Sequence, residues 1–345
     1  MFQDISLEEL RLLQTRKPIT VIDVRSPSEY KDSTLPGSLN IPLFDDQERA
    51  EVGTLYKQVS VQAAKERGLE IVSAKLPAFI KSFGAIQGDK AVFCWRGGMR
   101  SRTTATVLSL MDIHAYRLLG GYKAYRKWVI DELETYDFKF KSYVIHGNTG
   151  TGKTNLLNKL KKSGHPVLDL EGLAGHRGSI FGQIGLHANN QRTFDSLLLE
   201  DLMALEQSPY ILFEGESKRI GKVVMPQFLA QHKDSATQLW IEMPLHSRVN
   251  QILEDYKPEQ FKGEYIAAFR NIKSRIHIPV AAEIERNLLA DRFGEAVALL
   301  LEHYYDPKYV FSSHQYEDVE KVVFKVNNIN EAETAVLSFL ADQSE

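Results

Sequence analysis

Residues 143–154 read YVIHGNTGTGKT and join a short apolar strand to the start of a helix. The segment from residue 147 onward fits the pattern G-x-x-x-x-G-K-T, in which glycines let backbone amides wrap a diphosphate group. In this pattern the lysine places a positive charge on the phosphates, and the threonine hydroxyl holds Mg²⁺. The sequence therefore predicts an α/β unit whose phosphate-binding residues are Gly147, Asn148, Thr149, Gly150, Thr151, Gly152, Lys153 and Thr154.

A second apolar run, residues 209–214, ends in a carboxylate, as the metal-binding strand of phosphate-loop proteins does. Glu214 is therefore a candidate partner of Thr154 at Mg²⁺, and an ordinary carboxylate at a strand end is an equal alternative. The glycine-rich polar segments 168–182 and 214–221 are expected to form loops over the phosphate site. Segment 168–182 is expected to be mobile, and the alternative for it is an ordinary surface loop rich in turns. The candidate substrate-binding residues of the two segments are His176, Arg177, Gly178, Ser179, Glu214, Glu216 and Ser217.

The single cysteine of the chain lies in the segment FCWRGGMRS, residues 93–101, between an apolar strand and a helix expected over residues 102–111. Ser101 is expected near the cap of that helix. Glycines followed by a helix N-terminus form an anion cradle that favours a thiolate, and arginines add positive charge. The segment predicts a nucleophilic cysteine, and the alternative is a small core residue. The candidate catalytic residues are Cys94, Arg96, Gly97, Gly98 and Arg100.

Strands and helices alternate through the first 130 residues. Strands are expected over residues 20–25, 39–42, 90–93 and 114–119, and residues 47–83 have helical periodicity. Such alternation predicts a parallel sheet with functional loops at the carboxyl ends of its strands. The charged and aromatic stretch 131–142 is the expected boundary between a domain of residues 1–135 and a second domain of residues 136–345.

The composition is that of a globular protein, with 43% hydrophobic and 25% charged residues and a net charge of −3. No run approaches the roughly 18 apolar residues of a membrane span, and the first residues lack the pattern of a secretory signal. One cysteine without an export signal predicts a reducing cytoplasm and no membrane partner. Because the chain has no excess of positive charge, a nucleic acid would bind at a local patch.

Two features of the expected helical region, residues 245–305, are candidates for RNA contacts. Arg270, Lys273 and Arg275 are spaced to share a helix face that phosphates could contact, although a solvated face is the more common explanation. The aromatic segment 303–309 is a candidate for stacking on a base, and packing against the core explains it almost as well. The following residues 321–345 predict one strand and one helix.

Four motifs in the first 130 residues resemble the rhodanese domain. They are residues 23–27, residues 35–42, the cysteine loop and residues 119–122, in that order. The resemblance implies that Cys94 carries sulfur or selenium and that Asp23 and Arg25 brace the loop. Two departures accompany it. Thr34 stands where many rhodaneses have histidine, and five residues separate Cys94 from Arg100, where sulfur-transferring rhodaneses usually have four. A longer loop admits a tetrahedral oxyanion, as in rhodanese-like phosphatases.

The whole chain resembles the tRNA 2-selenouridine synthase family, because a rhodanese-like unit precedes a P-loop NTPase-like α/β unit with the segments 168–182 and 214–217. The resemblance implies replacement of sulfur by selenium in wobble 2-thiouridine of tRNA through an S-geranyl intermediate. The implied co-substrates are geranyl diphosphate and selenophosphate, and contact with a selenophosphate-producing enzyme is also expected. The residues leave open whether the phosphate loop binds geranyl diphosphate or a nucleotide such as ATP.

Two alternative functions come from different classes. A sulfurtransferase or phosphatase fused to a nucleotide-dependent kinase-like domain would turn over thiosulfate or a phosphate ester, and would hydrolyse ATP without tRNA. A regulatory binding protein would bind tRNA without forming a product.

Overall fold

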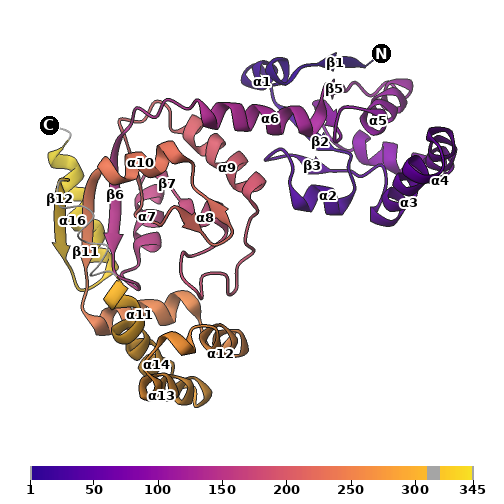
Figure 1. Cartoon of the computed structure of the whole chain (residues 1–345). Helices are drawn as coiled ribbons and strands as arrows, with labels where there is room; N and C mark the ends of the chain where they lie inside the picture. Colours follow the sequence, from indigo (N-terminus) through magenta and orange to yellow (C-terminus); the bar gives the residue numbers. More distant parts are fainter. Residues whose placement is uncertain (1, 309–318, 344–345) are drawn as a thin grey trace. The chain divides into compact units, whose positions relative to one another are not determined.

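The computed structural model describes residues 2–308 and 319–343 and divides into two compact units. The first unit comprises residues 1–135 with 195–199, and the second comprises residues 136–194 with 200–345. Each unit is built on a five-stranded parallel sheet flanked by helices (Figure 1). The α/β architecture with parallel sheets that the sequence predicts is therefore confirmed.

The sheet of the first unit has the strand order β1-β5-β4-β2-β3, and every neighbouring pair is parallel. Its central strand β4 is an apolar run whose Ala91, Val92 and Phe93 are fully buried. The strands are β1 (Gln3–Ile5), β2 (Ile19–Asp23), β3 (Leu39–Asn40), β4 (Asp89–Phe93) and β5 (Tyr116–Leu118). The helices are α1 (Leu7–Arg16), α2 (Pro27–Asp32), α3 (Asp46–Gln58), α4 (Val61–Gly84), α5 (Met99–Leu110) and α6 (Gly121–Glu134).

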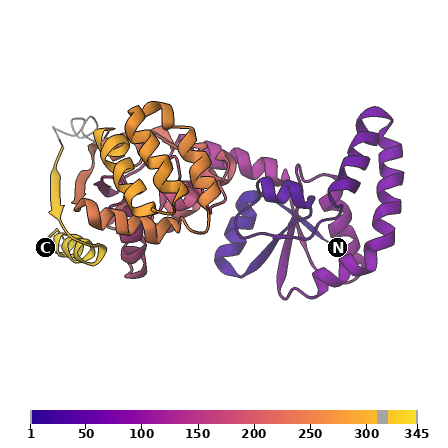
Figure 2. The same cartoon turned by 90° about the horizontal axis from the view of Figure 1, so that it is seen from below.

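The helical periodicity of residues 47–83 is confirmed, whereas the start of the next predicted helix needs correction. The helical region 47–83 is two helices, α3 and α4, which Figure 2 shows side by side as a hairpin. The break falls at Ser60, whose hydroxyl caps α4 by accepting a hydrogen bond from the amide of Ala63. Helix α5 begins at Met99 with Gly98 as its cap, so Ser101 lies inside the helix and is not its cap.

The sheet of the second unit has the order β12-β11-β6-β8-β7 and is also parallel throughout. Because β6 and β8 are neighbours, the loop after Gly147 and the carboxylate of Glu214 leave the same edge of the sheet. The strands are β6 (Lys141–Gly147), β7 (Val167–Leu168), β8 (Tyr210–Glu214), β11 (Thr237–Glu242) and β12 (Lys321–Lys325), with β9 (Arg219–Ile220) and β10 (Val223–Val224) forming a separate antiparallel pair. The helices outside the helical region are α7 (Lys153–Lys162), α8 (Leu170–Ala174), α9 (Gln191–Ala204), α10 (Gln227–Ser235) and α16 (Ile329–Asp342).

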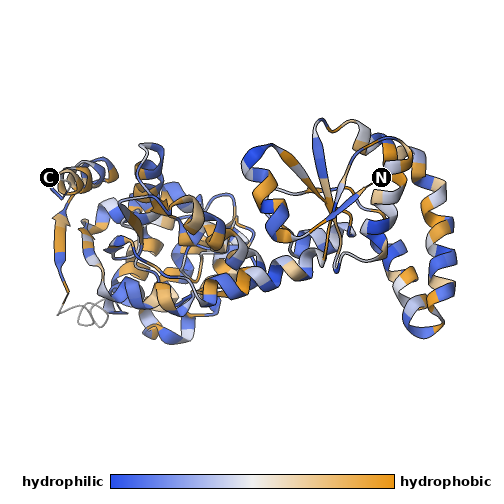
Figure 3. Cartoon of the chain, turned by 90° about the horizontal axis from the view of Figure 1, so that it is seen from above, coloured by the Kyte–Doolittle hydropathy of each residue, from blue (hydrophilic) through white to orange (hydrophobic). Residues whose placement is uncertain are grey.

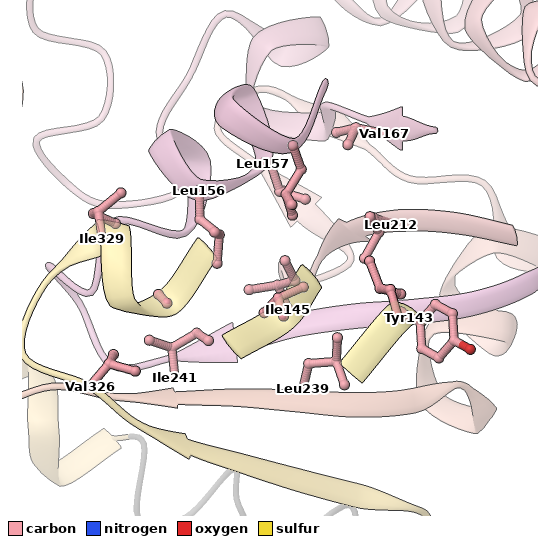
Figure 4. Close-up of a cluster of buried hydrophobic side chains, with 14 residues drawn as sticks. Tyr143, Ile145, Leu156, Leu157, Val167, Leu212, Leu239, Ile241, Val326 and Ile329 are labelled. Carbon is pink, nitrogen blue, oxygen red and sulfur yellow. The ribbon is translucent and has the colours of Figure 1, made fainter. Parts of the chain in front are cut away.

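Helix α7 is anchored to this sheet by its apolar face. Figure 4 shows Leu156 and Leu157 pointing from α7 toward Ile145 on β6, and all three side chains are buried. Burying one leucine contributes about 1.5–3 kcal/mol. The packing therefore fixes the start of α7, and with it the phosphate loop, against the strand that precedes it.

Residues 245–305 are mostly helical, as predicted. They form α11 (Leu245–Tyr256), α12 (Lys262–Arg270), a 3₁₀ turn η1 (Lys273–Arg275), α13 (Ile278–Leu289), α14 (Phe293–Leu300) and a π-helical turn η2 (Leu301–Tyr305). Helices across the chain carry hydrophobic and hydrophilic residues together, as helices with one face on a core do (Figure 3), and the helices of this region bury such a face. Within residues 2–308 and 319–343, no helix has the length and apolar character that a bilayer crossing requires.

The predicted cationic helix face is wrong. Arg270 ends α12, whereas Lys273 and Arg275 lie in the 3₁₀ turn that follows. Arg270 and Lys273 both form ion pairs with Glu285 of α13, at 3.1 and 2.5 Å. Two of the three cations therefore connect neighbouring helices and do not form a shared phosphate-binding surface with the third.

Candidate active sites

The cysteine loop of the first unit connects β4 to α5 and is held by the start of α6. The amide of Tyr122 donates to the carbonyl oxygen of Cys94, and the amide of Lys123 donates to that of Trp95, both at 2.9 Å. Gly121 makes this close approach because it has a positive φ of 56° and no side chain. A Cβ atom there would lie 2.1 Å from the carbonyl oxygen of Cys94. The conformation of the cysteine loop therefore depends on the glycine that starts the next helix.

Asp23 and Arg25 form a buried ion pair beneath this loop, with 0% and 1% of their surfaces exposed. Arg25 Nη2 donates to Asp23 Oδ2 and to the carbonyl oxygen of Ser33, each at 2.6 Å. The Arg25 guanidinium also lies 4.5 Å from the ring centroid of Tyr122. Thr34, which stands in place of a histidine, donates its hydroxyl to Asp23 at 2.9 Å. Both charged groups bind partners inside the unit, so the contacts support a role in bracing the loop and not in the reaction.

Replacing Arg25 by methionine is expected to destabilise the first unit by about 3–5 kcal/mol, because a buried carboxylate then loses its charged partner. Urea unfolding followed by near-ultraviolet circular dichroism measures the change. The double variant Asp23→Asn with Arg25→Met is the control, and it is expected to recover part of the loss because no unpaired charge remains. A single variant as stable as the wild type would contradict the bracing role.

Cys94 lies at the floor of its loop and is only 3% exposed. Its Sγ atom lies 3.2 Å from Ser101 Oγ, and the side chain also packs against the core of the unit. Arg96 and Gly98 are exposed on the rim, and Gly97 is half-buried with a positive φ of 64°. The sulfur atom is thus more covered than a freely exposed nucleophile, while the loop around it is open to solvent.

Arg100 is bound to a carboxylate on α2. Its Nη2 atom donates to Glu29 Oε1 at 3.1 Å. Burial opposes the charge on each partner, but the ion pair outweighs burial, so the pKa of Arg100 is raised and that of Glu29 is lowered. Cys94 also contributes to the raised pKa of Arg100 through its charge, so the guanidinium lies within electrostatic range of the thiol. The guanidinium near the thiol is thus ion-paired with Glu29 and is not a free positive charge.

The phosphate loop of the second unit has the conformation expected of its sequence. Gly150 and Gly152 have positive φ angles of 86° and 69°, which glycine adopts without strain. The Lys153 ammonium donates to the carbonyl oxygen of Gly147 at 3.0 Å and so lies across the loop. The hydroxyl of Thr151 donates to the carbonyl oxygen of Asn148 at 3.0 Å. The predicted phosphate-binding residues are therefore gathered around one concave turn.

A buried arginine that the motif does not include supports this loop from outside. Arg248 of α11 donates through Nε to the carbonyl oxygen of Thr149 at 2.9 Å. Its two terminal nitrogens bind Asp306 at 2.9 and 2.6 Å, and Asp306 also accepts a hydrogen bond from Asn148 at 3.2 Å. The helical region thus holds the phosphate loop through a bidentate ion pair.

A second carboxylate, Glu171, joins the predicted Glu214 next to Thr154. Thr154 Oγ1 donates to Glu171 Oε2 at 2.6 Å. Glu214 lies beneath, 0% exposed, and accepts a hydrogen bond from the backbone amide of Glu171 at 3.3 Å. Among the described residues, Glu214 Oε1 has no hydrogen-bond partner. Burial, followed by the charge of Glu216, raises the pKa of Glu171 to about 8, and burial with the charge of Glu171 also raises the pKa of Glu214.

These oxygen atoms fit a phosphate-bound Mg²⁺. Among residues 2–308 and 319–343, no three or more His, Cys, Asp or Glu side chains are arranged to hold a metal ion. Mg²⁺ that is bound by one or two side chains together with phosphate oxygens and water needs no such group. The Thr154 hydroxyl would hold it together with Glu171, whose proton the cation would displace on binding.

The raised pKa of Glu171 predicts a pH dependence of stability. An unfolded glutamate ionises near pH 4.5, whereas Glu171 in the fold holds its proton to about pH 8. The stability that the fold gains from keeping Glu171 protonated is complete below pH 4.5. It is lost as the pH rises toward 8, by at most about 1.4 kcal/mol per pH unit. The Glu171→Gln variant should lose less stability than the wild type between pH 5.5 and 7.5 in urea unfolding. Equal losses would contradict the raised pKa.

The phosphate loop opens into a cleft of about 680 Å³. Four predicted substrate residues line it, namely Arg177, Gly178, Ser179 and Glu216. The Arg177 guanidinium lies 4.9 Å from the ring centroid of Tyr256, and Ser179 Oγ lies 3.3 Å from the Tyr256 hydroxyl. A Cβ atom on Gly178 would lie 2.3 Å from a carboxylate oxygen of Glu216. The positive φ of 66° at Gly178 favours glycine at this approach of the backbone to the acidic wall of the cleft.

Two other predicted substrate residues have supporting contacts outside the cleft lining. His176 Nδ1 accepts a hydrogen bond from the amide of Gly178 at 3.1 Å, and burial lowers the pKa of this histidine. Ser217 donates its hydroxyl to the carbonyl oxygen of Arg219 at 2.6 Å. Both side chains therefore shape the segments that border the cleft.

Comparisons with known proteins agree with this geometry. The sequence profile described as "tRNA 2-selenouridine synthase AAA domain" matches residues 140–277, and that of the rhodanese-like domain matches residues 6–128. A curated relative from Nitrosomonas europaea, named tRNA 2-selenouridine synthase, is 38% identical over 73% of this chain and 67% of its own length. Relatives of the same name from Sulfurovum sp. and Pseudomonas syringae pv. syringae are each 32% identical, over 89% and 95% of this chain and 92% and 95% of their own lengths.

The chain belongs to the tRNA 2-selenouridine synthase family. The family resemblance inferred from the sequence is therefore confirmed, and the two matched domains fall on the two α/β units.

Within this member of the tRNA 2-selenouridine synthase family, the segment 168–182 is only partly the mobile loop that was predicted. Residues 170–174 form α8, whose Leu170 and Ala174 are buried in the core. Of the predicted aromatic segment 303–309, Tyr304 and Tyr305 line the cleft, and Tyr309 lies outside the described residues. The sequence patterns therefore identified segments that contribute to the cleft, but they did not show which residues of these segments pack into the core.

Proposed function

We propose that this protein replaces the sulfur of wobble 2-thiouridine in tRNA by selenium, through an S-geranyl-2-thiouridine intermediate. Membership of the family supports the tRNA substrate and the product, because the relatives are named for that reaction. The single observation that carries the proposed chemistry is the presence of two reactive centres in one chain. One is the Cys94 thiol beside Arg100, and the other is a diphosphate cradle with Lys153, Thr154 and Glu171.

The first step is assigned to the phosphate loop. The sulfur of 2-thiouridine attacks C1 of geranyl diphosphate, a C–S bond forms, and the C–O bond to the diphosphate breaks. Lys153 and the loop amides stabilise the charge that develops on the departing diphosphate. Bound Mg²⁺, held by Thr154 and Glu171, would add positive charge to the same group. Alkylation matters because the modified sulfur leaves as a neutral thiol in the next step.

The second step is assigned to the cysteine loop and needs no oxidant, since selenophosphate carries selenium at the oxidation level of the sulfur that it replaces. The Cys94 thiolate attacks phosphorus, an S–P bond forms, and the P–Se bond breaks to release hydrogen selenide. Selenium then bonds to C2 of the uridine as the C2–S bond breaks, and geranyl thiol leaves with a proton. Water finally cleaves the S–P bond and releases phosphate.

Features of the cysteine loop support attack at phosphorus. Five residues separate Cys94 from Arg100, a spacing that admits a tetrahedral oxyanion. Ser101 Oγ lies 3.2 Å from the sulfur, close enough to donate to the thiolate when it leaves phosphorus. A perselenide on Cys94 would instead require oxidation of selenium, and no oxidant takes part in the proposed reaction.

The RNA enters this proposal as a single-stranded anticodon loop, whose wobble base can be splayed outward at modest cost. Contact with the enzyme that produces selenophosphate is also part of the proposal.

The test incubates the full chain with a 2-thiouridine anticodon stem-loop, geranyl diphosphate, Mg²⁺ and selenophosphate, and analyses nucleosides by mass spectrometry. The complete mixture should give 2-selenouridine, and omission of selenophosphate should give S-geranyl-2-thiouridine. An unchanged nucleoside from a folded protein would contradict the proposal. Thiosulfate turnover with ATP hydrolysis in the absence of RNA would favour the fused sulfurtransferase instead.

A further inference from the structure

A second, apolar pocket adjoins the phosphate-loop cleft. Five residues line both spaces and so form the mouth between them: Thr149, Ser179, Ile252, Tyr256 and Tyr305. The inner wall comes from Phe181 in the loop before α9 and from residues of the helical region, among them Tyr265, Phe293, Val297 and Leu300. A space lined by hydrocarbon therefore begins at a residue of the phosphate loop itself.

The apolar character of this wall favours a hydrocarbon chain over a nucleoside as the group attached to the bound phosphates. Burial raises the pKa of Tyr256 to about 12, so its hydroxyl stays neutral, and the Tyr265 hydroxyl already donates to the carbonyl oxygen of Tyr256 at 2.8 Å. The inner wall carries no charged side chain. A nucleoside would bury its ribose and base polar groups there without partners, at a cost of several kcal/mol. A hydrocarbon chain attached to a diphosphate has no such groups to satisfy.

We propose that this pocket binds the hydrocarbon tail of a prenyl diphosphate and limits the tail's length, an inference that rests on the proposed geranyl step. The pocket volume is about 50 Å³. A cavity of about 150 Å³ takes up benzene, so a pocket of this volume holds only the branched end of one isoprene unit. The first isoprene unit then lies at the mouth and the second in the pocket, which leaves no room for a third.

Helix α14 supplies the face that sets this limit. Phe293, Val297 and Leu300 lie at i, i+4 and i+7, which places them on one side of the helix, toward the pocket. Phe293 and Leu300 are buried in the core, whereas Val297 is only half-buried. Val297 is therefore the position where the pocket can be filled or enlarged with least damage to the fold.

The experiment compares geranyl diphosphate and farnesyl diphosphate as competing donors to the 2-thiouridine stem-loop, with mass spectrometry of the prenylated nucleosides. Val297→Phe fills the pocket and should lower geranyl transfer at least about tenfold, while its affinity for inorganic pyrophosphate by calorimetry stays within about twofold of the wild type. Val297→Ala enlarges the pocket and should raise the ratio of farnesyl to geranyl product about tenfold. Leu299→Ala is the matched control, because Leu299 packs against the same core outside the pocket.

The outcomes separate this inference from the proposed function. If the wild type transfers neither prenyl group, the proposed geranyl step fails. If the wild type transfers geranyl and both folded Val297 variants keep its donor ratio and rate, the tail lies elsewhere and the inference is overturned. Loss of pyrophosphate binding in Val297→Phe would also overturn it, because the pocket would then act on the diphosphate site.

Discussion

Replacing Cys94 by serine is expected to abolish selenium incorporation and to leave formation of S-geranyl-2-thiouridine unchanged. Serine keeps the shape of the side chain but lacks a thiolate, so it cannot take the phosphate group of selenophosphate. Loss of a covalent nucleophile lowers turnover by at least about 10³-fold. Nucleoside mass spectrometry of the complete reaction should show the geranylated nucleoside accumulating in place of 2-selenouridine.

Met99 offers the matched control for the cysteine variant. It is the first residue of α5, directly after the cysteine loop, with 59% of its surface exposed, so Met99→Ala is expected to retain both products. A folded Cys94→Ser variant that forms 2-selenouridine at a rate near the wild type would remove Cys94 from the mechanism.

The second large effect is expected from Lys153→Ala, which should lower geranyl transfer about 10²–10³-fold, because the ammonium offsets charge on the departing diphosphate. The measurement is release of pyrophosphate in the presence of 2-thiouridine RNA and geranyl diphosphate. Lys162→Ala is the control, because Lys162 is exposed at the last position of α7. Undiminished pyrophosphate release from Lys153→Ala would show that the phosphate loop serves another ligand.

Local sequence patterns predicted much of this architecture. The strand, loop and helix around Gly152 and the glycine-rich segment around Cys94 each lie within one continuous stretch, so their composition is enough to predict them. Strands β1, β7, β9, β10 and β11 were not predicted. Strands β1 and β7 are three and two residues long and owe their existence to pairing with distant strands.

The parts of the site that the sequence did not predict depend on distant contacts. Arg248 reaches Thr149 from 99 residues away, and its helix carries no pattern that marks one arginine among its polar residues. Glu171 lies within the glycine-rich segment 168–182, but only the fold shows its hydrogen bond with Thr154, 17 residues earlier in the chain. The apolar pocket is assembled from the phosphate loop, the loop before α9 and the helical region, so no single stretch encodes it.

The central claim is that the thiol and the diphosphate cradle serve one RNA base in succession, each in its own half-reaction. The most direct test supplies the intermediate ready-made, as a stem-loop containing S-geranyl-2-thiouridine, together with selenophosphate and the Lys153→Ala variant. The account predicts 2-selenouridine at a rate within about twofold of the wild type, since the impaired step is bypassed. Failure of this variant to convert an intermediate that the wild type converts would contradict the separation of the two half-reactions.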